Sequence, residues 1–161
     1  MNAMQIQIST DYALRILLYL QENRGELQTA TTISEAIGVT YPFFIKLACQ
    51  LKKHGLVNAM CGRNGGYALG KPACEISVYD VFLAIEGEVQ ISRCFKKEDD
   101  KCTSSHKERC KVRRFLHILQ EGVIIAPMSR MRLSDLTHIG EGKESSDKDL
   151  QKLRSRFNAI A

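Results

Sequence analysis

The sequence predicts a mainly α-helical fold that carries one small β-hairpin. Three observations support this fold class: apolar residues recur at helical spacing over the first 55 residues, a glycine-rich segment occupies 62–66, and a long amphipathic stretch follows Cys110. Apolar residues make up 44% and charged residues 25% of the 161-residue chain, which is typical of a globular protein. A chain of this length is expected to form one domain, or one small domain with an appendage.

The first helix is predicted over residues 10–23. Ser9 and Thr10 can cap its start, and Asp11 lies in the first turn, where the helix dipole favours a negative charge. Gly25 can end the helix in a left-handed conformation. The apolar residues at helical spacing are Tyr12, Ala13, Ile16, Leu17 and Leu20. That face of the helix should lie in the core.

A short helix, a glycine turn and a longer helix follow. The sequence ATTISEAIG predicts the short helix, with Thr31 or Thr32 as its cap and Gly38 at its end. The longer helix, PFFIKLACQLKKHG, begins after Thr40, has proline in its first turn and stops at Gly55. This spacing is typical of a helix-turn-helix, and two packed helices in an all-α domain would look the same.

The charge distribution favours a polyanionic partner. No Asp or Glu occurs from Ala36 to Cys74, although the whole chain carries a net charge of only +5. The basic residues of that stretch are Lys46, Lys52, Lys53, Arg63 and Lys71. The apolar stripe expected in the core comprises Phe44, Leu47, Ala48 and Leu51. The lysines lie off this stripe, so the longer helix can present them to the phosphates of a nucleic acid.

A β-hairpin is predicted directly after the longer helix. The segment LVNAMCGRNGGYAL is apolar, then polar and glycine-rich, then apolar again. Residues 56–57 start one strand, residues 67–69 form the other, and residues 62–66 make the turn. A helix-turn-helix followed at once by such a hairpin is a winged helix. Arg63 at the tip of the wing can reach phosphate or a narrow minor groove.

The second half of the chain predicts further helices. Ser77 can cap a short helix in ISVYDVFLAIEG that ends at Gly87, and 133–136 suggests one more helical turn. A long helix should follow Cys110, with Pro127 kinking or ending it. Its apolar residues are Val112, Phe115, Leu116, Leu119, Val123 and Met128. Such a helix after a winged domain is a usual dimerisation element, although a helix that covers its own core would look the same.

Several classes of protein are disfavoured by what the sequence lacks. It shows no paired carboxylates in an apolar setting, no catalytic His–Cys spacing and no phosphate-binding loop, so we do not expect an enzyme. No run of about 18 uncharged apolar residues exists, so no membrane partner is expected. The first 21 residues lack the pattern of a secretory signal. We therefore expect a cytoplasmic protein, in which stable disulfides are disfavoured.

The chain resembles the Rrf-two family of bacterial winged-helix transcription regulators over roughly residues 4–137. LKKHGLVNAMCGRNGGYALGKP looks like the family signature, and STDYALRILLYL, VYDVFLAIEG and MRLSDL match its pattern. The family contains regulators of iron–sulfur cluster biogenesis, of nitric oxide stress and of iron supply. The resemblance implies a homodimeric repressor that binds double-stranded DNA, with its third helix in the major groove and its wing in the minor groove.

The resemblance also implies DNA-contacting positions. The start of the recognition helix is expected to present Thr40, Tyr41, Phe43, Phe44 and Lys46. The wing is expected to present Gly62, Arg63, Asn64, Gly65, Gly66 and Tyr67. Phosphate contacts are expected from Lys46, Lys52, Lys53 and Arg63. Two departures from the family pattern stand out: Cys61 replaces a common arginine before the wing, and Ile45-Lys46 replaces a frequent Glu-Gln. A different operator, or apolar contact with thymine methyl groups, would follow.

Three cysteines lie in the polar segment CFKKEDDKCTSSHKERC, at Cys94, Cys102 and Cys110. Thiolates bind iron–sulfur clusters, and the resemblance implies a [2Fe-2S] or [4Fe-4S] cluster here. Both gaps between the cysteines hold seven residues, whereas gaps of five prevail in the family. For the fourth ligand, the resemblance implies Asp11 from the other subunit, ahead of His106. The position of a ligating histidine in some members is Arg113 in this chain.

The cysteine segment keeps other interpretations open. Zinc, a metal-free thiol switch and cysteines without function are the alternatives to a cluster. Regulation through a protein partner is a further one, because some family members lack the three cysteines. Of the other cysteines, Cys49 is predicted to lie in the core, Cys74 is interpreted as incidental, and Cys61 is a candidate for a modifiable thiol near DNA.

These observations divide the chain into five segments and lead to one functional hypothesis. The segments are a winged helix-turn-helix DNA-binding domain (1–72), a supporting helix and connection (73–93), the cysteine loop (94–110), a dimerisation helix region (111–139) and a flexible polar tail (140–161). The hypothesis is a homodimeric transcription regulator that senses iron, nitric oxide or redox state. Loss or nitrosylation of the cluster would free the cysteine loop and change the spacing of the two recognition helices.

Overall fold

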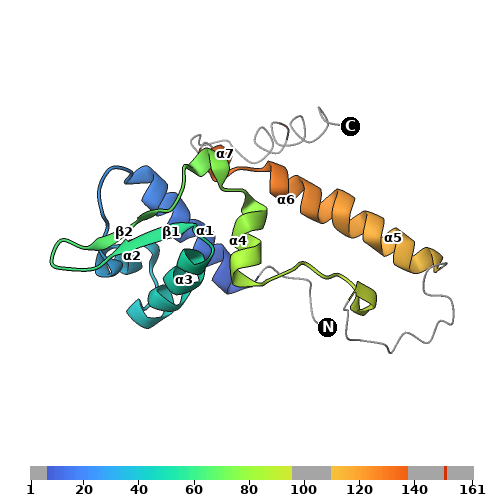
Figure 1. Ribbon diagram of the computed structural model, residues 1–161, viewed down its shortest axis with the longest axis horizontal. Helices are drawn as coiled ribbons and strands as arrows, with labels where there is room; N and C mark the ends of the chain where they lie inside the picture. Colours follow the sequence, from blue (N-terminus) through green and yellow to red (C-terminus); the bar gives the residue numbers. More distant parts are fainter. Residues whose placement is uncertain (1–6, 96–109, 138–150, 152–161) are drawn as a thin grey trace.

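A computed structural model describes residues 7–95, 110–137 and 151. Its elements, in chain order, are α1 (Ile8–Glu22), α2 (Ala30–Ile37), α3 (Tyr41–Lys53), β1 (Val57–Met60), β2 (Gly66–Leu69), η1 (Ala73–Glu75), α4 (Val78–Ile85), η2 (Arg93–Phe95), α5 (Lys111–Leu119), the π-helical turn η4 (Gln120–Ile125), α6 (Ala126–Arg130) and α7 (Leu133–Leu136). The predicted fold class, mainly helical with one hairpin, is confirmed. Figure 1 shows the hairpin projecting from one end of a helical body and the α5–η4–α6 rod projecting from the other.

A single core joins α1 to the three other helices of the body. The predicted stripe of α3 is buried, and so is the predicted face of α1 except for Tyr12, which is half-buried. α1 packs on α2, α3 and α4, so it lies at the centre of the body. Because each large apolar side chain buried here contributes about 1.5–3 kcal/mol, this core holds α3 firmly while its other face meets water.

The starts of α1 and α2 differ from the prediction. α1 begins at Ile8, and Thr10, expected as a cap, is buried inside the helix. Its hydroxyl donates a hydrogen bond to Glu86, whose Oε1 also accepts from the backbone N–H of Gln7 at 3.2 Å. A carboxylate 79 residues away in sequence thus accepts hydrogen bonds at the start of α1, a role that a local capping side chain often has.

α2 is capped two or three residues earlier than predicted. Thr29 Oγ1 accepts from the backbone N–H of Thr32 at 3.2 Å, so neither Thr31 nor Thr32 is the cap. The helix ends at Gly38 as predicted, with φ of 71°. Thr40 occupies the N-cap position of α3, but its side chain makes no capping hydrogen bond.

The hairpin pairs β1 with β2 in antiparallel register, from Val57 opposite Leu69 to Met60 opposite Gly66. Gln28, in the connection between α1 and α2, extends this sheet by exchanging two backbone hydrogen bonds with Tyr67, of 2.8 and 3.0 Å. The hairpin is therefore tied to the body along its second strand, and the wing is not a free arm.

α4 starts where the end of the rod returns to the body. Ser77 caps α4 as predicted, and a capping box with Asp80 completes the cap, with hydrogen bonds of 2.9 and 3.0 Å. Beside it, the backbone N–H of Leu133 donates to Ile76 at 2.8 Å, and that of Val78 donates to Met131 at 2.9 Å. These bonds join the C-terminal end of the rod to the start of α4.

The rod continues through Pro127, which was expected to kink or end the helix. The preceding turn, η4, is π-helical, and the backbone N–H of Ala126 bonds to the carbonyl of Glu121, five residues earlier. Such a wider turn accommodates a proline, which has no N–H to donate. The helix ends at Arg130, three residues beyond the proline. No helix within the described ranges is long and apolar enough to cross a membrane.

Candidate DNA-binding surface and cysteine site

One face of α3 is exposed along its whole length. Pro42, Lys46, Cys49 and Lys53 are all exposed, and their spacing of four, three and four residues places them on one side of the helix. Lys52 flanks this row and is exposed too. We call Pro42, Lys46, Cys49 and Lys53 the α3 row. Because the opposite side of α3 is buried, the helix can meet a partner only through this face.

Phe44 does not belong to that surface, and the expectation that it faces the groove is wrong. Phe44 is fully buried, with its ring packed edge-on against Tyr67 at 5.0 Å. Phe43 is half-buried and packs edge-on against Tyr12 at 5.8 Å. Thr40 and Tyr41, at the start of the helix, are exposed as expected, and Tyr41 exposes 54% of its surface.

Cys49 was predicted to lie in the core and is exposed. Its apolar neighbours in sequence suggested burial, yet it sits one position past buried Ala48, and one residue rotates a helix by about 100°. The spacing to Lys46 and Lys53 was the signal that could have found it. Cys49 is therefore a residue of the α3 row that sequence reasoning missed.

The wing presents Arg63 and Asn64 at its exposed tip. Gly62 adopts φ of 117°, and its carbonyl accepts from the backbone N–H of Gly65 at 3.0 Å. A Cβ at Gly65 would come within 2.3 Å of the Met60 carbonyl oxygen, so that position requires glycine.

Gly66 shapes the wing in a different way. It is buried, and a Cβ on it would meet the Gln28 carbonyl oxygen at 2.9 Å. This close approach allows β2 to pair with the Gln28 segment. Gly65 and Gly66, both predicted to contact DNA, thus have a structural explanation of their own, which leaves the exposed tip residues to reach a partner.

Tyr67 joins α3 to the wing. Burial raises the pKa of the Tyr67 hydroxyl, and the neighbouring Tyr41, Cys49 and Cys61 raise it further. Two of these neighbours belong to α3 and one lies at the start of the wing turn. The ring of Tyr67 also packs against Phe44 of α3, so this tyrosine links α3 to the second strand of the wing.

The basic residues of this surface are not equivalent. Lys46, Lys52, Lys53 and Arg63 are exposed and make no ion pair within the described ranges. Lys71 instead forms an ion pair with Asp80 at 3.5 Å. Four cations are therefore available to phosphates, and these are the four expected from the sequence.

The two described cysteines of the triad lie at the ends of the 96–109 segment. Cys94 belongs to η2, Cys110 is the N-cap of α5, and both are half-buried. The sulfur of Cys110 accepts from the backbone N–H of Arg113 at 3.5 Å, where the helix dipole favours a negative charge. Cys102 and His106 lie outside the described residues.

The donor set for a cluster is not assembled within the described ranges. No group of three or more His, Cys, Asp or Glu side chains there is placed to hold a metal ion. Asp11 is exposed and pairs with Arg15 at 3.0 Å, within its own helix. Sulfur is the right kind of donor for iron, but the geometry of one chain does not by itself form the site.

The comparison with known protein families shows which family the chain belongs to. The profile of the Rrf2 family, described as an iron-dependent transcriptional regulator, matches residues 6–139. The chain belongs to the Rrf2 family. A DNA-binding transcription regulator with a winged helix follows, and this confirms the resemblance seen in the sequence.

Named relatives agree with this assignment. The chain is 31% identical over 115 residues to the HTH-type transcriptional regulator NsrR of Shouchella clausii, covering 71% of this chain and 76% of that protein. It is 35% identical over 99 residues to protein aau3 of Rhizobium meliloti, covering 62% of this chain and 64% of that protein. The match to aau3 thus spans just under two thirds of its length.

Solved structures share the fold at low sequence identity. CymR (YrzC), the global cysteine regulator of B. subtilis, matches with a TM-score of 0.65 at 21% identity, covering 84% of this chain and 97% of that chain. IscR of T. potens matches with a TM-score of 0.66 at 19% identity, covering 92% and 97%. At such identities these structures establish a common fold. They do not show that the proteins respond to the same molecule.

Proposed function

We propose that this Rrf2 protein is a cytoplasmic, homodimeric repressor that reads an operator with the α3 row and the wing tip. One observation carries the proposal: the α3 row, the flanking Lys52 and the wing tip together expose four cations that make no ion pair within the described ranges. No acidic residue interrupts the sequence from Ala36 to Cys74. Phosphate contacts to such cations position the protein, and the remaining α3 side chains can reach base edges in the major groove.

The first prediction tests this surface. An operator is selected from random duplexes with the purified protein, and its affinity is measured over a series of salt concentrations. Lys46→Ala and Arg63→Ala should each weaken binding and lower the salt slope by about 1, because each phosphate contact releases about one counterion. Lys111→Ala, an exposed lysine of α5, is the matched control. If both variants bind like the wild type at physiological salt, the docking is wrong.

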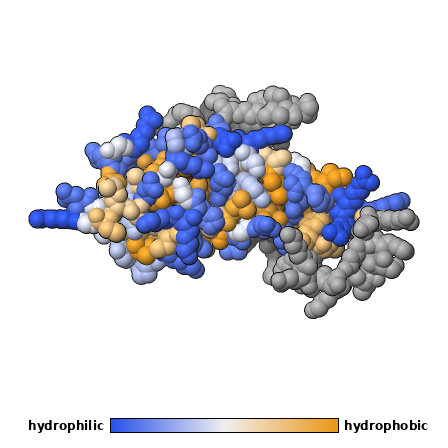
Figure 2. Space-filling model, in the orientation of Figure 1, coloured by the Kyte–Doolittle hydropathy of each residue, from blue (hydrophilic) through white to orange (hydrophobic). Residues whose placement is uncertain are grey.

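Dimerisation is proposed through the rod. Val112, Phe115, Ile118 and Val123 expose between 61% and 64% of their surface. Figure 2 shows apolar surface along this end of the molecule. Large apolar side chains exposed in a row mark an interaction site, and a second copy of the same helix is a self-complementary occupant. Two recognition helices would then bind half-sites about one helical turn, or a multiple, apart.

Sensing through an iron–sulfur cluster is the finer proposal. Cys94, Cys102 and Cys110 would hold the cluster, with Asp11 of a second subunit as the proposed fourth ligand. The family description as iron-dependent and the position of both described cysteines beside the rod support it. Iron, nitric oxide or redox state would be the signal. Zinc, a metal-free thiol switch and a protein partner remain the alternatives. The division of the chain into five segments, with the cysteine loop between the supporting helix and the dimerisation helix, is part of this proposal.

The second prediction measures iron and acid-labile sulfide per chain after anaerobic purification. A coloured protein that is bleached by Cys102→Ala, and unchanged by Cys74→Ala, is expected. Cys74 is a fitting control because it is exposed and lies outside the triad. A colourless protein with neither iron nor sulfide after anaerobic reconstitution would rule out the cluster and leave the DNA-binding surface untouched.

A further inference from the structure

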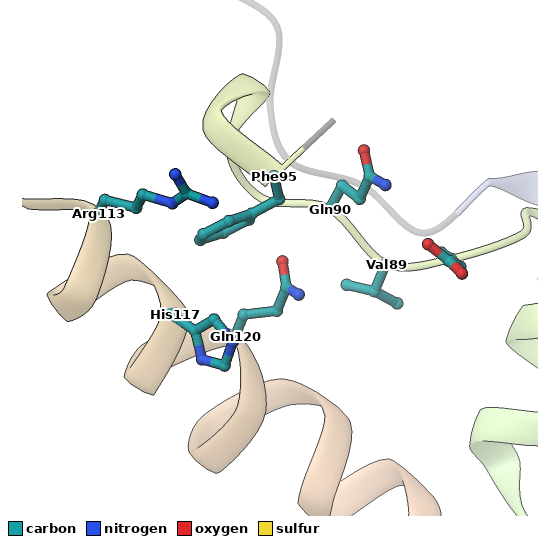
Figure 3. A pocket seen from close by; sticks show the side chains of 7 residues that line it. Val89, Gln90, Phe95, Arg113, His117 and Gln120 are labelled. Atoms are coloured by element: carbon teal, nitrogen blue, oxygen red, sulfur yellow. The ribbon is translucent and has the colours of Figure 1, made fainter. Parts of the chain in front are cut away.

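The segment after α4, residues 88–95, faces the rod, and we call it the strap (Figure 3). No residue of α5 is buried. At the base of the rod α6 packs on α4, but in the described part of the chain no element packs extensively on α5 except η4, which continues it. The strap is therefore the support that the body offers to the outer half of the rod.

One buried side chain fastens the strap to the rod. Gln120, at the junction of α5 and η4, exposes only 7% of its surface. Its Oε1 accepts a hydrogen bond from the backbone N–H of Ile91, 29 residues away in sequence, at 3.1 Å. Breaking this bond would leave a nearly buried amide oxygen without that partner, so the strap is held at this point.

A second contact lies one helical turn further out along the rod. The Phe95 ring packs edge-on against His117, with the centroids 5.8 Å apart. Figure 3 shows this ring between the Arg113 side chain and the Gln120 amide. Next to these contacts is a hollow of about 260 Å³, which Arg113, His117 and Gln120 line from the rod. Because the two surfaces are not closely packed here, the hydrogen bond and the ring contact have to fix the strap.

The strap and the apolar face of the rod lie on opposite sides. Ile118 precedes Gln120 by two residues, which places it about 200° around the helix. Ile118 exposes 63% of its surface and belongs to the face proposed for dimerisation. The body thus holds one side of the rod at Gln120, and a second copy would meet the other side.

The direction of the rod matters because small bends become large displacements. Sharp bends of helices occur at π-helical turns, and η4 begins at Gln120. The nine residues of α5 span about 14 Å, so a bend of about 20° at η4 would move the far end of α5 by about 5 Å. That displacement exceeds one base-pair step of DNA, which is about 3.4 Å.

We propose that Gln120 is a positioning residue for operator recognition. By fastening the strap at Ile91, it fixes the direction of α5 relative to the winged body, and with it the distance between the two recognition helices of the dimer. The protein then distinguishes operators by the spacing of their half-sites. This inference rests on the proposed dimer and DNA-binding surface.

The test measures the spacing preference, which is the ratio of the dissociation constants for altered and original operators. The selected operator is lengthened or shortened at its centre by one base pair. Gln120→Met keeps the size of the side chain and removes the acceptor, so the preference should fall about fivefold. Gln90→Met, the same replacement at an exposed residue of the strap, should leave it unchanged. Affinity for a single half-site should stay the same in both variants, because α3 and the wing are intact.

Two further measurements separate positioning from a general loss of structure. Hydrogen exchange of the Ile91 amide should become about fivefold faster in Gln120→Met. Phe95→Leu, which removes the ring contact with His117, should lower the spacing preference in the same direction. Thermal unfolding and sedimentation of each variant verify that it is folded and has the oligomeric state of the wild type.

The outcomes distinguish this inference from the function on which it rests. Faster exchange of Ile91 with an unchanged spacing preference would overturn the positioning role and leave the DNA-binding proposal standing. Unchanged exchange in Gln120→Met, or an equal fall in preference in Gln90→Met, would overturn it as well. A wild-type protein that selects no operator would instead refute the DNA-binding proposal, and the positioning role would fall with it.

Discussion

At the scale of single residues, Cys49 decides how α3 is interpreted. Sequence neighbours placed it in the core, and the helix geometry places it between Lys46 and Lys53 on the exposed face. A small thiol at that position would leave room for α3 in the proposed docking to a DNA groove. The two phenylalanines near the start of the helix face the body of the protein instead, since Phe44 lies in the core and Phe43 packs on Tyr12.

The third prediction follows from the position of Cys49. Two variants each keep the cysteine triad and one of the exposed cysteines, Cys49 or Cys74, with serine at the other one and at Cys61, and both are treated with N-ethylmaleimide. The adduct on Cys49 should abolish operator binding, because it adds bulk where α3 meets DNA. The adduct on Cys74, which lies on η1, should not. Electrophoretic retention of the operator, before and after labelling, measures the effect, and equal losses in both variants would contradict it.

At the scale of elements, the start of α4 shows how a local signal and a long-range contact combine. The Ser77 cap was readable from the sequence, but the ion pair of Asp80 with Lys71 was not. Burial raises the pKa of Asp80, and the hydrogen bonds from Ser77 together with the charge of Lys71 outweigh it, so the net pKa lies below its ordinary value of 3.8. The ionised carboxylate therefore stabilises the fold.

The fourth prediction uses the sign of that shift. A carboxylate with a lowered folded pKa stabilises the protein above its unfolded pKa and loses that effect as pH falls through the folded value. Asp80→Asn should thus cost about 1 kcal/mol in the free energy of unfolding at neutral pH, because water partly screens the site. The difference from the wild type should shrink as the pH falls below 3.8 and through the lowered folded pKa of Asp80. Urea unfolding across this range measures it, and Glu75→Gln, an exposed neighbour, should show no such dependence.

The rod contains a proline that does not end its helix. A proline within a helical pattern indicates a kink or an end, yet here the helix continues to Arg130. The wider turn at Gln120–Ile125 absorbs the missing N–H. Beyond the end of the rod the chain returns to the start of α4, where Leu133 is buried and its backbone N–H donates a hydrogen bond to Ile76.

At the scale of the whole molecule, the exposed apolar side of the rod is the observation that supports the proposed dimer. The body has a complete core of its own, whereas the rod leaves four large apolar side chains in water. Burial of each in an interface would contribute about 1.5–3 kcal/mol before the entropy cost of association. A dimer would also provide two recognition helices.

The fifth prediction tests the dimer. Phe115→Glu should shift the protein from dimer to monomer in analytical ultracentrifugation, because it places a charge in an apolar interface. Operator affinity should fall at the same time, since a monomer contacts one half-site. Arg114→Glu, one position away on the exposed polar side of α5, should leave the dimer intact. A wild type that sediments as a monomer at concentrations that saturate the operator would contradict the proposal.

The sequence by itself determined the helical segments, the hairpin, the caps at Gly38 and Ser77 and the acid-free stretch on which the DNA-binding proposal rests. These features depend on neighbours a few residues apart, where periodicity and capping act. The tertiary structure alone decided that Glu86 caps α1 and that Gln28 extends the wing sheet. It also placed Cys49 on the surface and formed the hollow at Arg113. Each of these depends on which distant segments meet, and packing of the whole chain sets those contacts.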